Sequence, residues 1–183
     1  KGGQWLVALA HLRGMRQQSL APGVIAFSAA VSACEKCAQW QQAWALLNDM
    51  RQEQVAPNVI TYSAAISACS SAGQWIVALA HMSEMRRRRV ALNAFTFSAA
   101  ISVCEKDGLW PLALAHLFQM RRQQVAPGTI HYNAVVSACG VGGQWLLALA
   151  QLHEMRVQVL SPDEISYNAA ISACEKSGQW LSA

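Results

Sequence analysis

Residues 59–93 read VITYSAAISACSSAGQWIVALAHMSEMRRRRVALN, and the rest of the chain repeats this pattern with a fixed period of 35 residues. Tryptophan shows the period most clearly, because six of the seven tryptophans follow it. These six are Trp5, Trp40, Trp75, Trp110, Trp145 and Trp180. A fixed period of this size is typical of stacked copies of one supersecondary unit. We therefore expect a single repeat array over residues 1–183.

The period also sets the expected boundaries of the repeats. The chain begins with a partial repeat at 1–23 and ends with a partial repeat at 164–183. The four full repeats between them are 24–58, 59–93, 94–128 and 129–163. Because both ends fall inside a repeat, we expect further repeats in the full-length chain.

Each repeat carries two stripes of apolar residues at helical spacing. In the first full repeat, the first stripe consists of Phe27, Val31 and Cys34. The second stripe consists of Trp40, Ala43, Leu47 and Met50. Spacings of three, four and seven residues place each stripe on one face of an amphipathic helix. We therefore predict a first helix near 25–36 and a second helix near 40–53, with the other repeats shifted by the period.

The predicted fold class is all-α, a right-handed α-solenoid of 35-residue helix-turn-helix repeats. Two helices of this length bury their apolar faces only when neighbouring repeats complete the core. We expect the first helices to line the concave side, with the second helices outside and the tryptophans in the core. Pro57 and its equivalents are expected to stop the second helix. Asn58 and its equivalents are expected to cap the next first helix.

Composition agrees with a well-buried helical array. Apolar residues make up 54% of the chain and charged residues 13%. No run of eighteen apolar residues occurs, so we expect no membrane span. The formal net charge of +4 favours an anionic partner, though only mildly.

The cysteines and histidines do not predict a metal site. Five of the six cysteines occupy one equivalent place per repeat on an apolar stripe, where free cysteine acts as a small buried hydrophobe. Cys34 and Cys37 form one C-x-x-C pair, but no second pair supplies the remaining zinc ligands. His11, His81 and His116 share one place on the second helix and are expected at the edge of the core. We predict no metal, no cofactor and no catalytic site, so the chain is not expected to be an enzyme.

The recurring residues resemble the pentatricopeptide repeat family. A usual unit of that family begins V-x-T-Y-N, carries glycine between its helices, continues with A-L and then M, and ends in P-D or P-N. The residues of 59–93 that match in register are Tyr62, Ile66, Gly73, Ala78, Leu79, Met85 and Asn93. The resemblance covers the whole chain and implies binding of single-stranded RNA, with about one base per repeat.

The resemblance also implies which residues select the base. One selector follows the aromatic residue of the first helix: Ser28, Ser63, Ser98, Asn133 and Asn168. The other closes the repeat: Gly23, Asn58, Asn93, Gly128 and Asp163. In this family, serine with asparagine tends to select adenine and asparagine with aspartate tends to select uracil, while a closing glycine leaves little discrimination. The four full repeats are therefore expected to contact A-A-N-U, from 5′ to 3′. Helix capping alone would also explain the asparagines and the aspartate.

Two further sets of residues are assigned through the resemblance. Apolar residues expected to sandwich bases between successive repeats are Ile25, Ile60, Phe95, Ile130 and Ile165. Lysines expected to face phosphates at the ends of first helices are Lys36, Lys106 and Lys176. Neighbouring glutamates such as Glu35 offset this charge, so we expect modest affinity for the RNA backbone.

The leading functional hypothesis is a sequence-selective single-stranded RNA-binding module of an organellar RNA-processing or RNA-stabilising factor. The mitochondrial or chloroplast location follows from the resemblance alone. One alternative is a protein-binding helical-repeat scaffold. Another is the specificity part of a larger RNA editing factor, whose catalytic part would lie outside this sequence.

Overall fold

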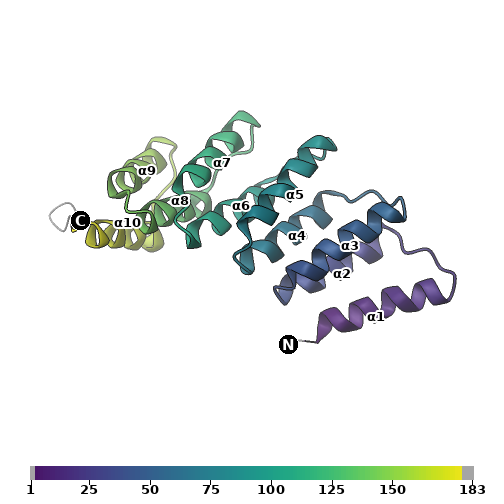
Figure 1. The fold of residues 1–183 in the computed structure, drawn as a ribbon. Coiled ribbons are helices and arrows are strands. Elements are labelled where there is room, and N and C mark those ends of the chain that lie inside the picture. Colours follow the sequence, from purple (N-terminus) through teal and green to yellow (C-terminus); the bar gives the residue numbers. More distant parts are fainter. Residues whose placement is uncertain (1–2, 179–183) are drawn as a thin grey trace. The chain divides into compact units, whose positions relative to one another are not determined.

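The computed structural model describes residues 3–178, which form ten α-helices and no strand (Figure 1). The helices are α1 (Gln4–Gln17), α2 (Val24–Lys36), α3 (Trp40–Gln52), α4 (Val59–Ser71), α5 (Trp75–Arg87), α6 (Ala94–Lys106), α7 (Trp110–Arg122), α8 (Thr129–Val141), α9 (Trp145–Val157) and α10 (Glu164–Lys176). The predicted all-α fold is confirmed. The predicted bounds of the first two helices in 24–58 differ from the observed ones by one residue each. Trp180 lies outside the described residues.

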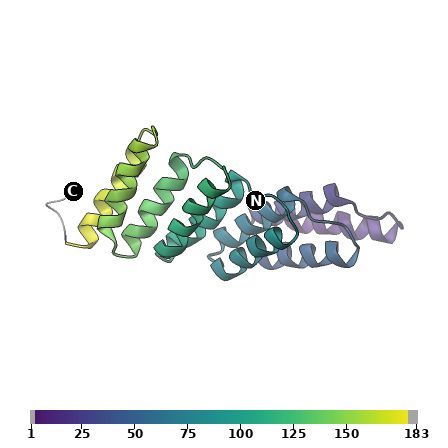
Figure 2. The same cartoon turned by 90° about the horizontal axis from the view of Figure 1, so that it is seen from above.

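The chain divides into two compact units, Lys1–Leu92 and Asn93–Ala183. The first unit holds α1 to α5 and the second holds α6 to α10. Inside each unit the first helices of successive repeats pack side by side, α2 on α4 in the first unit and α6 on α8 on α10 in the second. The second helices α3, α7 and α9 each pack against the first helix before and the first helix after them, as α3 does with α2 and α4. Figure 2 shows these antiparallel hairpins from a second direction.

The core of each unit consists of the apolar stripes that the sequence predicts. Phe27, Val31 and Cys34 on α2 have no exposed surface. The small residue of the second helices, Ala43 and its equivalents, is also fully buried. A methyl group at this place lets the two helices of a hairpin approach closely, so the repeat of small residues reflects packing distance.

The tryptophans are less buried than expected. Each described member of the column lies at or next to the start of a second helix and is only half-buried. In the second unit the Trp110 ring covers the turn of the following repeat: a Cβ atom added at Gly142 would lie 2.4 Å from Trp110 Cδ1. The prediction that the indoles fill the core was wrong. A side chain on the first turn of a helix lies at the edge of the hairpin, where it covers a turn.

The second helices end at a left-handed turn, and proline is not what stops them. The backbone N–H of Val55 donates to the carbonyl of Met50 at 2.8 Å, and Gln54 between them has a φ of 58°. This bond satisfies a carbonyl that the helix end leaves open. Pro57 comes five residues after α3 ends at Gln52. The repeat that has Leu92 in place of proline ends its second helix in the same way, with Val90 donating to Met85 at 2.9 Å.

Ion pairs join second helices of successive repeats within each unit. Arg16 Nη2 lies 3.0 Å from Asp49 Oδ2 and 2.6 Å from Glu53 Oε1 in the first unit. Arg121 Nη2 lies 2.8 Å from Glu154 Oε1 in the second unit. These side chains are about one-third exposed, so each pair contributes at most about 1 kcal/mol to stability. Arg16 and Arg121, which follow the methionine of their repeats, therefore align neighbouring hairpins within their units.

The buried cysteines and histidines behave as packing residues. All six cysteines are free thiols, and burial raises the pKa of Cys34 to about 11 and that of Cys69 to about 12. His81 is buried beside Trp44, with 5.2 Å between the ring centroids. Burial, assisted by the nearby Arg51, lowers the pKa of His81 to about 4, so the imidazole is neutral at neutral pH. His11 is exposed. Within residues 3–178, no three His, Cys, Asp or Glu side chains are grouped to hold a metal ion.

The turn inside the first full repeat gives a test of backbone strain. Ala38 holds a φ of 52° where the other repeats have glycine, such as Gly73 with a φ of 70°. Because a Cβ atom disfavours this region, Ala38→Gly should raise the free energy of unfolding by about 1 kcal/mol. Gly73→Ala should lower it by a similar amount, although a Cβ atom there would meet no other atom within 4 Å. Chemical denaturation followed by circular dichroism measures both changes.

The matched control is Ala29→Gly, on the exposed face of α2. Here the same substitution should lower the free energy of unfolding by about 1 kcal/mol, because glycine is a poor helix former. If Ala38→Gly and Ala29→Gly were equally destabilising, the left-handed turn at Ala38 would be wrong.

Candidate nucleic-acid interface

The residues that close the repeats lie immediately before the first helices, as their N-caps. Asn58 Oδ1 accepts the backbone N–H of Thr61 at 3.0 Å, and Asn93 Oδ1 accepts that of Thr96 at 2.9 Å. Asp163 Oδ1 accepts the backbone N–H of Ser166 at 2.9 Å. The capping role expected of these residues is confirmed. The other selector, which follows the aromatic residue, lies about one turn into each first helix. The two kinds of selector therefore lie near the same end of the first helices.

In the first unit, Thr61 joins the two selectors of the repeat 24–58. The hydroxyl of Thr61 donates to Asn58 Oδ1 at 2.9 Å, and its oxygen lies 2.7 Å from Ser28 Oγ. A carbonyl oxygen cannot donate, so the Thr61 proton points at Asn58 and Ser28 must donate to Thr61. Ser28 thus offers only lone pairs to a further partner. Because Asn58 Oδ1 is used twice, Asn58 offers the N–H groups of its amide.

In the second unit, the two selectors of the repeat 129–163 bond to each other directly. Asn133 Nδ2 donates to Asp163 Oδ1 at 3.0 Å. The hydroxyl of Ser166 donates to Asp163 Oδ1 at 2.8 Å and also contacts Asn133 Oδ1. Asn133 therefore offers its remaining N–H, and Asp163 offers its second carboxylate oxygen. In the repeat 24–58 the first selector offers an acceptor and the closing residue offers donors, whereas here the first selector offers a donor and the closing residue offers an acceptor.

The hydrogen bonds also fix the charge of Asp163. The backbone N–H of Ser166, the Ser166 hydroxyl and the Asn133 amide hold the pKa of Asp163 below its ordinary value. Each of these groups donates to the carboxylate and so favours the ionised form. Asp163 is therefore a carboxylate at neutral pH, and it can accept a hydrogen bond but cannot donate one.

In the repeat 94–128, a histidine stands between the selectors. His131 Nδ1 accepts the backbone N–H of Gly128 at 3.0 Å. Its Nε2 lies 2.9 Å from Ser98 Oγ and 3.2 Å from the carbonyl oxygen of Ala94. His131 is buried, and Ser98 is half-buried.

The selectors differ in how far they are exposed. Ser63 in the first unit is 4% exposed and Asn133 in the second is 8% exposed. Asn93 is exposed, and its Oδ1 accepts the Thr96 hydroxyl at 2.8 Å, as Asn58 does with Thr61. Asn168 is exposed on α10. Ser63 belongs to the first unit and Asn93 to the second.

The apolar residues expected to sandwich bases are all exposed. They form one column at the second residue of each repeat, with exposed fractions of 84% for Ile25, 60% for Ile60, 51% for Phe95, 67% for Ile130 and 65% for Ile165. Exposed apolar side chains that gather on one surface are typical of an interaction site. This column lies three residues before the selector on the first helix, so it shares that end of the helix with the polar selectors.

The charged residues give a weaker signal. Lys36, Lys106 and Lys176 are exposed at the last residues of α2, α6 and α10. They lie at the opposite end of the first helix from the N-cap selectors. The arginine run Arg86 to Arg89 is partly engaged: Glu84 pairs with Arg87 and Arg88, and Arg51 lies 3.8 Å from Glu84. These contacts lower the pKa of Glu84, with the hydrogen bond from Arg88 the largest cause.

The residues that join the selectors were missed by the sequence analysis. They occupy the third place of each following repeat and are Thr61, Thr96, His131 and Ser166. Each lies three residues after a closing residue, which is the spacing of a capping box. That spacing was the available signal, and it was obscured because Gly128 cannot cap through a side chain. We call these four residues the third-residue column.

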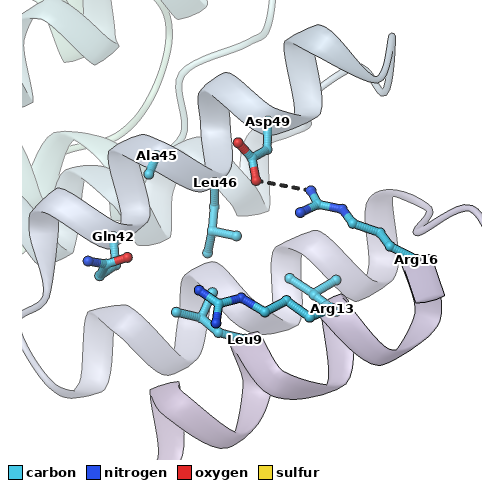
Figure 3. Close-up of a pocket in the computed structure, with 8 residues that line it drawn as sticks. Leu9, Arg13, Arg16, Gln42, Ala45, Leu46 and Asp49 are labelled. Carbon is cyan, nitrogen blue, oxygen red and sulfur yellow. Dashed lines mark hydrogen bonds and ion pairs between the residues drawn. The ribbon is translucent and has the colours of Figure 1, made fainter.

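One cavity of the first unit lies elsewhere. It has a volume of about 190 Å³ between α1 and α3, and its lining includes Leu9, Arg13, Leu46 and Asp49 (Figure 3). Both helices are second helices, so the cavity shares no residue with the selectors. None of the helices in residues 3–178 combines the length and apolarity needed to cross a membrane.

Comparisons with known proteins agree on one family. Profiles described as the PPR repeat family match residues 22–71 and 57–106. A profile described as the PPR repeat matches 95–125, and one described as the pentatricopeptide repeat domain matches 117–177. No curated protein sequence matches the chain.

Solved structures share the fold. The pentatricopeptide repeat protein PPR10 in complex with an 18-nt psaJ RNA element is 29% identical, with a TM-score of 0.76 over 98% of this chain and 26% of that one. A second solved structure, of the pentatricopeptide repeat protein PPR10 from maize, is 27% identical, with a TM-score of 0.76 over 97% of this chain and 25% of that one. The chain thus spans about a quarter of the PPR10 chains that it matches.

A more distant match extends the same fold. The PPR domain of Arabidopsis thaliana protein-only RNase P 1, in complex with tRNA, is 14% identical, with a TM-score of 0.79 over 99% of this chain and 92% of that one. At this identity the match concerns the fold alone. Together these matches confirm the predicted fold class, an α-solenoid of helix-turn-helix repeats.

The exposure of the apolar column predicts how it responds to truncation. Ile60→Ala on α4 should change the free energy of unfolding by less than about 0.5 kcal/mol, because the side chain is mostly exposed. Ile66→Ala on the same helix is the matched control. It should cost about 2–5 kcal/mol, because Ile66 has no exposed surface. Chemical denaturation measures both, and a large loss for Ile60→Ala would show that this column belongs to the core.

Proposed function

Because this chain belongs to the pentatricopeptide repeat family, we propose that it is a sequence-selective, single-stranded RNA-binding module that reads about one base per repeat. The proposal includes the rest of the sequence-based hypothesis. The module is non-catalytic, the four full repeats form one array, and the protein serves RNA processing or stability in a mitochondrion or chloroplast. The RNA complex of PPR10 supports RNA as the ligand class.

The exposed apolar column is the observation that carries this proposal. Ile25 and Ile60 are large apolar side chains on successive first helices of one unit, and both are exposed. Water is a poor environment for such side chains, whereas the faces of an unstacked base match them in size and polarity. The polar selectors Ser28 and Asn58 lie at the same end of these helices. Apolar surfaces for the base faces and polar groups for the base edge thus occur together.

The polarity of each selector pair supports the base assigned to it. Ser28 offers an acceptor and Asn58 offers donors. Adenine has a matching edge, because its exocyclic amino group donates and its neighbouring ring nitrogen accepts. Cytosine shares this polarity, and the family preference for serine with asparagine favours adenine. Ser28 and Asn58 are therefore proposed to read A.

The repeat 129–163 has the opposite polarity. Asn133 offers a donor and the Asp163 carboxylate offers an acceptor. Uracil has a carbonyl oxygen beside a ring N–H, which complements this pair. Asn133 and Asp163 are therefore proposed to read U. With Ser63 and Asn93 assigned to A from the family preference, the proposed target is A-A-N-U.

A change of one atom type at Asn58 tests the assignment. Asn58→Asp keeps a good N-cap and replaces the amide donor by an acceptor. We expect the preference at the first base to shift from A towards G by roughly tenfold, because the ring N–H and the exocyclic amino group of guanine are adjacent donors that match two acceptors, the carboxylate and Ser28. Titration of the full chain with labelled A-A-N-U and G-A-N-U oligonucleotides measures the shift.

Asn48→Asp on α3 is the matched control, because it makes the same chemical change on a second helix. It should leave the base preference unchanged. Equal binding of A-A-N-U and a scrambled oligonucleotide by the unmodified chain would contradict sequence-selective RNA binding and favour a protein-binding scaffold.

A further inference from the structure

The repeat 94–128 is the one full repeat whose closing residue, Gly128, has no side chain. In the structure, the imidazole of His131 engages two groups that third-residue hydroxyls engage in other repeats. These are the backbone N–H of the closing residue, as with Ser166, and the hydroxyl of the first selector, as with Thr61. The imidazole satisfies the backbone N–H of Gly128 through Nδ1 at 3.0 Å and contacts Ser98 Oγ through Nε2 at 2.9 Å. His131 is buried, so these contacts hold the ring in one orientation.

The bond from Gly128 fixes where the ring carries its proton. A backbone N–H can only donate, so Nδ1 accepts and carries no proton. The proton of the neutral ring is then on Nε2, since the hydrogen bond made by one ring nitrogen sets the state of the other. Nε2 therefore donates, both to Ser98 Oγ at 2.9 Å and, more weakly, to the Ala94 carbonyl at 3.2 Å.

Ser98 consequently has the opposite hydrogen-bonding role from Ser28. Ser28 donates a hydrogen bond to Thr61 and offers its lone pairs to a further partner. Ser98 accepts a hydrogen bond from His131, so its own hydroxyl group can donate to a further partner. The two serines occupy the same place in their repeats and are both half-buried, so their difference comes from the third-residue column.

We propose that His131 is a positioning residue that makes Ser98 a hydrogen-bond donor, so that the repeat 94–128 selects a base with a carbonyl oxygen where adenine and cytosine carry the exocyclic amino group, namely uracil or guanine. This inference rests on the proposed function and replaces the expected lack of discrimination at the third base. It extends the polarity seen elsewhere: an acceptor at Ser28 suits an amino group, and a donor at Ser98 suits a carbonyl oxygen. Within this pair of bases, Ser98 alone does not choose between uracil and guanine.

The chain can accommodate a swap of the two networks. Gly128 has an extended backbone, with φ −105° and ψ 179°, which asparagine adopts without strain. The nearest atom to a Cβ added there is His131 Nδ1 at 3.9 Å. The double variant Gly128→Asn/His131→Thr therefore installs the residues that stand at Asn58 and Thr61. The single variant His131→Ala has a precedent in Ala26, which fills the third place of the repeat 24–58.

The experiment titrates the full chain with four oligonucleotides, A-A-X-U, in which X is A, C, G or U and the flanks are constant. Companion oligonucleotides change only the first or only the fourth base, and a scrambled oligonucleotide is the reference. The unmodified chain should prefer U and G over A and C by about fivefold, the effect of one neutral hydrogen bond. His131→Ala should remove this preference and leave the preferences at the first and fourth bases unchanged. The double variant should reverse it in favour of A. Thermal unfolding of each variant verifies that it is folded.

The outcomes separate this inference from the proposed function. If the first and fourth bases are discriminated but all four X bases bind equally, or His131→Ala keeps the preference, the role of His131 is overturned and the proposed function stands. If no oligonucleotide binds better than a scrambled one, both are overturned. An independent readout is the 15N NMR signal of His131, which should show an unprotonated Nδ1; a protonated Nδ1 would also overturn the role of His131.

Discussion

The hydrogen bond between the residue that closes one repeat and the first turn of the next is the constraint on which the rest of this structure depends. The start of each first helix leaves backbone N–H groups without intrahelical partners, and Asn58, Asn93 and Asp163 satisfy one of them with a side-chain oxygen. The oxygen that caps also accepts the hydroxyl of the third-residue column. Helix capping thus determines which atoms of the closing residue remain for a ligand.

This constraint joins folding to recognition within each unit. Thr61 belongs to the repeat 59–93 and contacts Ser28 and Asn58 of the repeat 24–58. These base-reading groups are therefore oriented only when the first helices of the two repeats, α2 and α4, pack together. The same packing spaces the exposed apolar residues along the unit. Capping and base reading are therefore uses of one network, and a change at the third residue alters the chemistry of a selector that it never replaces.

The fold could be predicted from the sequence because period and helical spacing leave little freedom. Phe27, Val31 and Cys34 share one face of any α-helix because of their spacing, and all three are buried in the structure. The role of proline was misjudged because the turn at Gln54, with its left-handed backbone, already ends the helix. The tryptophans were placed too deep because apolar character was taken as burial, whereas the start of a short helix lies at the edge of its hairpin.

The candidate site could be predicted only in part, for a physical reason. The positions of the selectors follow from the resemblance, and the exposure of Ile25 and its equivalents supports a binding surface. The direction of each hydrogen bond depends on a third side chain, and no spacing rule reveals that His131 donates where Thr61 accepts. Hydrogen-bond polarity needs three residues in contact, and these residues come from two repeats.

The most direct test of the central claim is a crystal structure of the full chain bound to an oligonucleotide that contains A-A-U-U. We expect the first adenine to lie between Ile25 and Ile60, with its amino group within hydrogen-bond distance of Ser28 Oγ and its ring nitrogen facing the Asn58 amide. RNA bound along the second helices, over Arg86 to Arg89, and without contact to Ser28 and Asn58 would contradict the account.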